Sequence, residues 1–201
     1  MVFTPCNRYG VAGTIDDEGR HVVSGDILHA VRQGLAFRFS HQFTSVAAAG
    51  TADILLDPSA NNAATVLRAA VDIETSVDCS VGIYENPTAS APGTEIIAYN
   101  LNRNGDPSMN SVGAVYHTPT VSAAGTLAAP VTHIAAALPT DITWQGVMGD
   151  VGAGDSARSV LPEIYLNRAK KYLIRVTNTG TVAGTITVSG RLILEPNYYE
   201  G

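Results

Sequence analysis

The residues that could do chemistry are scattered along the chain, and the best cluster of carboxylates is Asp72, Glu74 and Asp78. They alternate with apolar residues, so in an extended strand they would share one outer face. Two carboxylates at a suitable separation cleave glycosidic bonds, one of them acting as the general acid. A solvated strand face carries the same pattern, and no second motif supports catalysis. We therefore favour a solvated face and expect no enzymatic activity.

Two other segments resemble parts of binding motifs. Gly152–Ala157 has the Gly-x-Gly-x-x-Ala spacing of a pyrophosphate-binding turn, but that turn requires a strand before it and a helix after it. We predict neither element and interpret the segment as a loop. The acidic run Asp16–Glu18 lacks the spacing of a calcium-binding loop and is interpreted as a solvated turn.

The histidines and cysteines also lack the spacing of a metal site. None of the five histidines forms a metal-binding motif, so we expect ordinary surface or packed side chains. The two cysteines are expected to be free thiols. We predict no catalytic, cofactor-binding or metal-binding residue and no cofactor. These side chains are His21, His29, His41, His117, His133, Cys6 and Cys79.

Composition limits the partners of the chain. The formal net charge is −6, and the densest basic stretch is Arg168–Lys171, which argues against nucleic-acid binding. Charged residues make up only 15% of the chain, whereas about 25% is typical of soluble domains. No apolar run reaches the roughly 20 residues of a membrane span, and no signal peptide is visible at the N-terminus. This profile is typical of a subunit, made in a cytoplasm, that buries part of its surface in an assembly.

The strongest structural signal is a period-two alternation of apolar and polar residues from Leu67 to Ile83. The run is about three times the usual strand length of about 5–6 residues. It therefore predicts two strands, or one bent strand, with the break around Thr75–Asp78. Leu35–Phe43 alternates in the same way and contains three of the four phenylalanines, so we expect it to anchor the core.

Further alternating runs complete an all-β prediction of about eight to ten strands. Tyr172–Thr177 and Thr185–Leu194 are predicted to form a closing hairpin through a turn at Asn178–Gly180. Ile27–Arg32 fits a helical turn or a strand, and we favour the strand. The remaining strands are expected at 52–56, 95–101, 112–117 and 132–134.

These patterns predict a chain in two parts. Residues 27–201 are expected to form an antiparallel β-sandwich or jelly roll. Residues 1–26 show little apolar periodicity and are expected to form an extended N-terminal arm. Such a segment is either a poorly ordered terminus or an arm that becomes ordered on a partner.

Four stretches, in this order, resemble tailed-bacteriophage capsid decoration (cement) proteins with a β-sandwich or jelly-roll body: His29–Leu56, Ser80–Asn104, Val115–Thr126 and Lys170–Gly180. The resemblance implies a virion protein on the capsid exterior, assembled in the host cytoplasm. It also implies contact with the major capsid protein and a homo-oligomer, most often a trimer. The family has no catalytic motif to carry over, and from the composition we expect no nucleic-acid or membrane partner.

An alternative role is a tail or fibre module that binds a host-surface glycan or receptor. Trp144, the only tryptophan, would then be an aromatic platform for a sugar ring. Aromatic residues make up only 6% of the chain, which is few for a glycan-binding surface. Trp144 is otherwise a packing or interface anchor, so we favour the capsid role.

Overall fold

The computed structural model describes residues 14–15, 21–22, 30–58, 65–102, 113–136, 157–160, 163–167 and 169–196. These residues are almost entirely β-strand, and antiparallel sheets pack against each other as a sandwich, which confirms the predicted fold class. The described helical structure is limited to one turn at residues 30–32. No described helix has the length and apolar character needed to cross a membrane.

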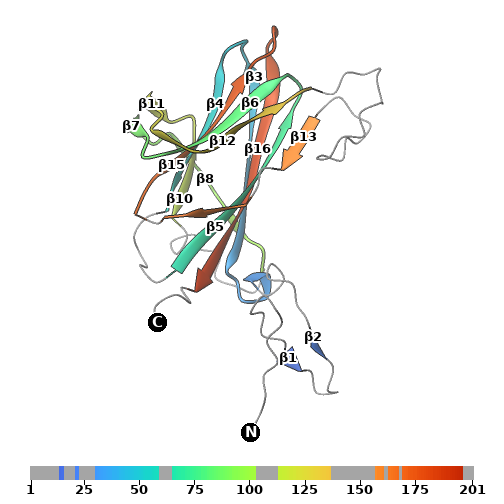
Figure 1. Cartoon of the computed structure of the whole chain (residues 1–201), viewed down its shortest axis with the longest axis vertical. Coiled ribbons are helices and arrows are strands. Elements are labelled where there is room, and N and C mark those ends of the chain that lie inside the picture. Colours follow the sequence, from blue (N-terminus) through green and yellow to red (C-terminus); the bar gives the residue numbers. More distant parts are fainter. Residues whose placement is uncertain are drawn as a thin grey trace.

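Two six-stranded sheets form the body of the molecule (Figure 1). Sheet I has the order β13-β5-β16-β3-β9, and β14 pairs with β5 beside β13. Its strands are β3 (Ala36–Val46), β5 (Thr65–Thr75), β9 (Tyr99–Asn100), β13 (Ala157–Val160), β14 (Ile164–Leu166) and β16 (Gly184–Pro196). Sheet II has the order β12-β6-β15-β4-β10-β8. Its strands are β4 (Thr51–Asp57), β6 (Cys79–Glu85), β8 (Thr94–Ile96), β10 (Ala114–His117), β12 (Thr126–Ile134) and β15 (Tyr172–Asn178).

The pairing of the long strands identifies the sandwich as a jelly roll. The first four long strands pair with later strands in reverse order: β3 with β16, β4 with β15, β5 with β13 and β14, and β6 with β12. Successive pairs alternate between sheet I and sheet II. The chain is thus one long antiparallel ribbon rolled into two layers, which is the arrangement of a jelly roll.

The predicted break in the alternating run 67–83 is confirmed. β5 ends at Thr75 and β6 begins at Cys79, and the two strands belong to opposite sheets. The Thr75 side chain is buried at the crossover, where its hydroxyl donates to the Val77 carbonyl and accepts from the Val77 amide. Because the odd-numbered residues face inward on both sides of this crossover, one uninterrupted pattern supplies core residues to both layers.

The predicted C-terminal hairpin is wrong. β15 pairs with β4 and β6 in sheet II, whereas β16 pairs with β3 and β5 in sheet I. The connection between them carries the chain across the sandwich, and the amides of Thr179 and Gly180 donate to the Asp78 carbonyl of the other crossover. Asn178 is buried there. Its amide nitrogen donates to the carbonyls of Val46 and Val182, so the corner is held by a side chain instead of a hairpin ladder.

Residues 30–32 form a helical turn, so the strand predicted at Ile27–Arg32 is wrong for the described part, and residues 27–29 lie outside it. The Leu35 amide donates to the Ala30 carbonyl and closes the turn. Ala30 packs with Ala36 and Ile193 in a small apolar cluster on the outer face of sheet I. This tertiary contact favours the helical alternative.

The segment between β6 and β12 adds strands at one side of the sandwich. β7 (Thr88–Ala91) and β11 (Thr120–Ala123) pair with each other and lie beside the body (Figure 1). β8 and β10 extend sheet II beyond β4, and β9 extends sheet I beyond β3. The strand predicted at 95–101 is therefore two short strands in different sheets.

The predicted N-terminal arm, residues 1–26, lies mostly outside the described residues. Within it, β1 (Thr14–Ile15) pairs with β2 (His21–Val22) in a short antiparallel ladder. The arm as a whole remains a prediction.

Candidate interaction surface

The carboxylates weighed for catalysis do not share one face, so that prediction is wrong for Asp78. Asp72 and Glu74 lie on β5, opposite Ser189 and Thr187 of β16 in sheet I. Asp78 lies in the crossover to sheet II, where its Oδ1 accepts a hydrogen bond of 2.7 Å from the Ala136 amide. The carboxylate of Asp78 therefore stabilises a corner of the sandwich.

The other residues considered in the sequence analysis lie partly within and partly outside the residues that the structure describes. Cys79 points into the core, and burial raises the pKa of its thiol to about 11. His133 lies exposed on the edge strand β12. Among the described residues, no three histidine, cysteine or acidic side chains are grouped to hold a metal ion. Cys6, Asp16–Glu18, His29, Trp144 and 152–156 lie outside the described residues, as does the side chain of His21.

The structure does bring two histidines together. His41 of β3 and His117 of β10 stack with ring centroids 3.7 Å apart and planes 13° from parallel, so the contact spans the two sheets. The Phe43 ring meets His41 edge-on at 4.6 Å. Burial, and secondly the neighbouring His117, lowers the pKa of His41 below its usual 6.5. The surroundings of His41 thus favour the neutral form of its imidazole.

Close backbone packing positions His117. Thr118 has φ of 53°, and its amide donates to the Asp53 carbonyl on the neighbouring β4. Gly93 has φ of 96°, and a Cβ there would lie 2.1 Å from the His117 carbonyl oxygen. Only glycine fits both the conformation and the space. This turn therefore fixes the end of β10 against β8.

Next to this stack, the chain crosses from the edge of sheet II to the edge of sheet I. Ile96 and Ala98 point inward and are buried, whereas Ile97 and Tyr99 are each 68% exposed and Leu101 is 38% exposed. We call these three outward residues the edge strip; Glu95 precedes them on β8, and Arg38 of β3 lies opposite Tyr99. It presents three large apolar side chains at a sheet margin, a feature that marks interaction sites in soluble proteins.

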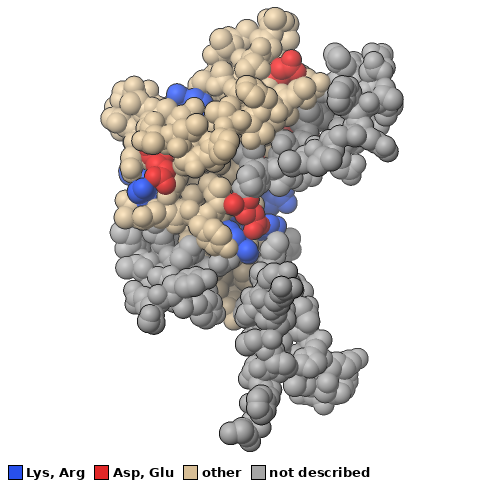
Figure 2. Space-filling view, in the orientation of Figure 1, with Lys and Arg blue, Asp and Glu red and all other residues tan. Residues whose placement is uncertain are grey.

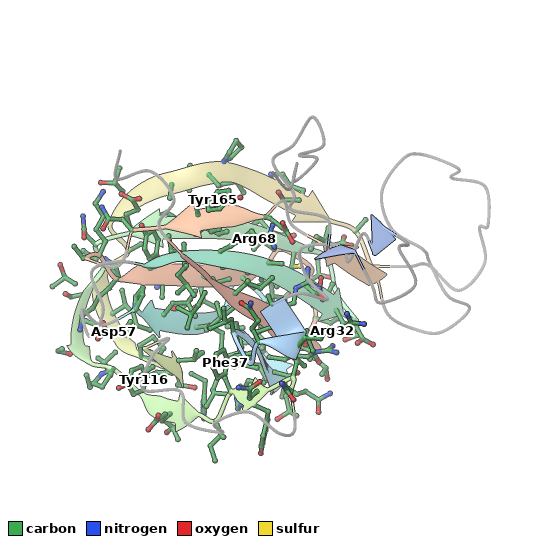
Figure 3. The ribbon with its side chains drawn as sticks, turned by 90° about the horizontal axis from the view of Figure 1, so that it is seen from below. Arg32, Phe37, Asp57, Arg68, Tyr116 and Tyr165 are labelled. Carbon is green, nitrogen blue, oxygen red and sulfur yellow. The ribbon has the colours of Figure 1, made fainter. Side chains whose placement is uncertain are left out.

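The backbone of the edge strip is held firmly by its neighbours. The Leu101 amide donates to the Ala36 carbonyl at 2.9 Å, and the Asn100 side chain donates to the Gly34 carbonyl at 2.9 Å. The Asn102 side chain donates to the Arg32 carbonyl at 2.8 Å, at the helical turn labelled in Figure 3. The apolar side chains are therefore displayed by a fixed backbone.

A positively charged region adjoins one end of the edge strip on the outer face of sheet I. Arg38 lies opposite Tyr99 on one side and Arg191 on the other. Glu163 bridges Arg191 at 3.1 Å and Arg68 at 3.5 Å. Arg68 lies on β5 opposite Tyr165 of β14, and both are labelled in Figure 3. Glu163 thus bridges Arg68 and Arg191, and Arg38 lies beside Arg191 on the neighbouring strand.

The opposite edge of sheet II is also apolar but differs in its backbone. Leu127 and Val131 are exposed on β12. The β12–β6 pairing shifts register twice, and Pro130 lies within the strand. Bulges and proline prevent a further strand from extending a sheet, so contacts at this edge must be made by side chains.

Comparison of the chain with protein-family models, curated proteins and solved structures finds no match in any of the three. The functional argument therefore rests on the fold and surface of this chain. Sequence reasoning missed both the edge strip and the histidine stack. The sequence predicted a strand at 95–101, but it could not show that both faces of this segment matter.

Proposed function

We propose that this chain is a structural virion protein that decorates and stabilises a tailed-phage capsid by binding the major capsid protein as a homo-oligomer. The observation that carries the proposal is the exposure of large apolar side chains on both edges of a complete jelly-roll body: Ile97, Tyr99 and Leu101 on one edge, and Leu127 and Val131 on the other. A module with two apolar margins suits contact with several neighbours at once.

The rest of the described surface supports an assembly role. Most of the described surface in Figure 2 is neither acidic nor basic. The charged side chains gather in small groups that contain ion pairs, such as Lys171 with Asp57 at 2.8 Å. Weakly charged surfaces with apolar and aromatic side chains are typical of protein–protein interfaces. The ordered resemblance of four stretches to decoration proteins supports the same role and implies a trimer.

Decoration also suits a small interface per subunit. Many copies bound to a repeating lattice act together, so a modest affinity at each contact gives a stable coat. Bridging neighbouring capsid subunits would oppose the outward pressure of packaged DNA. No reaction is required of the protein, only a rigid body that presents fixed contact surfaces.

The test is to purify particles of a phage that encodes this chain, with and without its gene. We expect mass spectrometry and electron cryomicroscopy to find the chain on heads at symmetry-related positions. Particles without it should release DNA at a lower temperature, and added purified protein should restore the wild-type value. Absence of the chain from purified heads would refute the proposal, and its presence on tails would favour the tail or fibre alternative.

A further inference from the structure

The arginines on the outer face of sheet I are unequally supplied with acidic partners. We call Arg38, Arg68 and Arg191 the arginine patch. Glu163 contacts Arg191 at 3.1 Å and Arg68 at 3.5 Å, so one carboxylate already lies between two of the three guanidinium groups. Arg38 is exposed and forms no ion pair with a residue that the structure describes. The patch therefore presents one guanidinium group that no described carboxylate neutralises.

The strand register places Arg38 and Arg191 side by side. They lie directly opposite each other on β3 and β16, and both face outward because the residues that alternate with them face the core. Tyr99 and Ala70 complete this row across four strands, and Asp72 lies on the same face in the next row. Like charges directly opposite each other destabilise a sheet. The free chain therefore carries a repulsion that an added anion would relieve.

The contacts of Glu163 indicate which anion suits the patch. They hold a carboxylate between guanidinium groups of neighbouring strands, and charge-assisted hydrogen bonds of this kind are strong. The surroundings favour a protein as the source of a second carboxylate. Tyr99 is 68% exposed opposite Arg38, Leu101 follows on the edge strip, and tyrosine beside arginine is typical of the energetic centres of protein interfaces. The net charge of −6 opposes a polyanion such as nucleic acid.

We propose that Arg38 and Arg191 together bind the carboxylate of an aspartate or glutamate on a partner protein, while Tyr99 and Leu101 contact apolar side chains beside that carboxylate. The bound carboxylate would bridge β3 and β16, as Glu163 bridges β16 and β5. The inference specifies the chemistry of the partner surface. It applies to any protein partner and does not depend on the virion role.

The first experiment follows the arginine side-chain NMR signals of the purified full chain during titration with a peptide of alternating glutamate and leucine. The signals of Arg38 and Arg191 should shift and saturate, whereas a peptide with glutamine in place of glutamate should cause no saturating shift. Arg38→Gln should weaken binding at least about tenfold, as expected for the loss of a charged hydrogen-bond donor. Lys171→Gln is the matched control, because it removes one positive charge beside Asp57 in sheet II and should leave binding unaltered.

Arg38→Glu gives the sharper test, because it should move two measurements in opposite directions. The change replaces the repulsion of Arg191 with an attraction, so the unfolding midpoint of the free chain should rise. It also places a carboxylate where the carboxylate of the peptide binds, so peptide binding should be lost. A misfolded variant would not unfold at a higher midpoint than wild type, so the two results together identify a binding defect.

Three results would overturn the proposal. One is a wild-type chain that binds the glutamate peptide no better than the glutamine peptide. The second is glutamate-peptide binding that Arg38→Gln leaves unaltered. The third is tighter binding of duplex DNA than of the glutamate peptide at the same salt concentration, lost in Arg38→Gln, because the patch would then be a phosphate-binding surface. None of these results depends on whether the chain is found on virions, so this inference and the proposed function can fail separately.

Discussion

Replacing Gly190 with alanine should destabilise the sandwich, because the core leaves no room for the added methyl group. Gly190 lies opposite Phe39 on neighbouring strands of sheet I. A Cβ at this position would lie 2.4 Å from both Cε1 and Cζ of the Phe39 ring and 3.2 Å from the Ala70 carbonyl oxygen. Phe39 is only 1% exposed, so its ring has no path into solvent.

The size of the effect follows from two opposing terms. Overpacking a well-packed core typically costs about 1–3 kcal/mol. Replacing glycine by alanine in a strand also stabilises the folded protein by roughly 0.5–1 kcal/mol, because the unfolded chain loses less conformational entropy on folding. We therefore expect Gly190→Ala to lower the free energy of unfolding by about 1–2 kcal/mol. For a chain of this length, that lowers the melting temperature by roughly 3–6 °C.

Urea denaturation measures the free energy directly, and the matched control is Gly82→Ala. A Cβ at Gly82 would lie 2.7 Å from Cε2 of Tyr84, but this side chain is partly exposed and can turn outward. Gly82→Ala should lower the free energy of unfolding by less than Gly190→Ala does. Combining Gly190→Ala with Phe39→Leu should cost less than the sum of the single changes, because the smaller side chain relieves the clash. A Gly190→Ala protein as stable as wild type, or strict additivity of the pair, would refute this reasoning.

Three further predictions concern pH, an ion pair and a thiol. Because the folded-state pKa of His41 lies below 6.5, its contribution to stability is present above pH 6.5 and is lost as the pH falls through the folded-state pKa. His41→Gln should therefore flatten the acid side of the stability profile measured by urea denaturation, and an unchanged profile would count against the role of the stack. Asp53→Asn should lower the free energy of unfolding by about 2 kcal/mol, because Arg175 donates to both Asp53 carboxylate oxygens at 2.9 and 2.7 Å. The same change at Asp57, whose partner lysine is more exposed, should cost under about 1 kcal/mol, and equal losses would contradict this ranking. At pH 8 a thiol reagent should label at most one of the two cysteines in native protein and both after denaturation, because burial raises the pKa of Cys79 to about 11; labelling of both in native protein would show that Cys79 is accessible.

The sequence predicted strands well wherever one face of the strand is buried. The alternation from Leu67 to Ile83 located β5, β6 and the break between them, and the phenylalanines of β3 located one wall of the core. Alternation reports only which side chains face inward. It therefore could not show that β5 and β6 belong to opposite sheets, or that β15 and β16 are not partners, because inward faces look alike in both layers.

The candidate surface was harder to predict for a related reason. In residues 96–101 both parities are apolar, since Ile96 and Ala98 are buried while Ile97, Tyr99 and Leu101 face solvent. The pattern of such a segment predicts an ordinary strand. That one apolar face is exposed becomes clear only when the segment is placed at the edge of a sheet. The His41–His117 stack joins residues that are far apart in sequence, so only the pairing of β3 and β10 with their own sheets reveals it.

The position of the last two strands governs how this chain can fold as it is synthesised. β16 lies between β3 and β5, and β15 lies between β4 and β6, so the first four long strands are not paired with one another. Neither sheet can be completed until β15 and β16 have left the ribosome, because each of them is the central partner of two earlier strands. Long-range pairing of this kind is slow to form. The nascent chain therefore exposes unpaired strand edges until β15 and β16 are made, and removal of these two strands should leave it prone to aggregation instead of merely less stable.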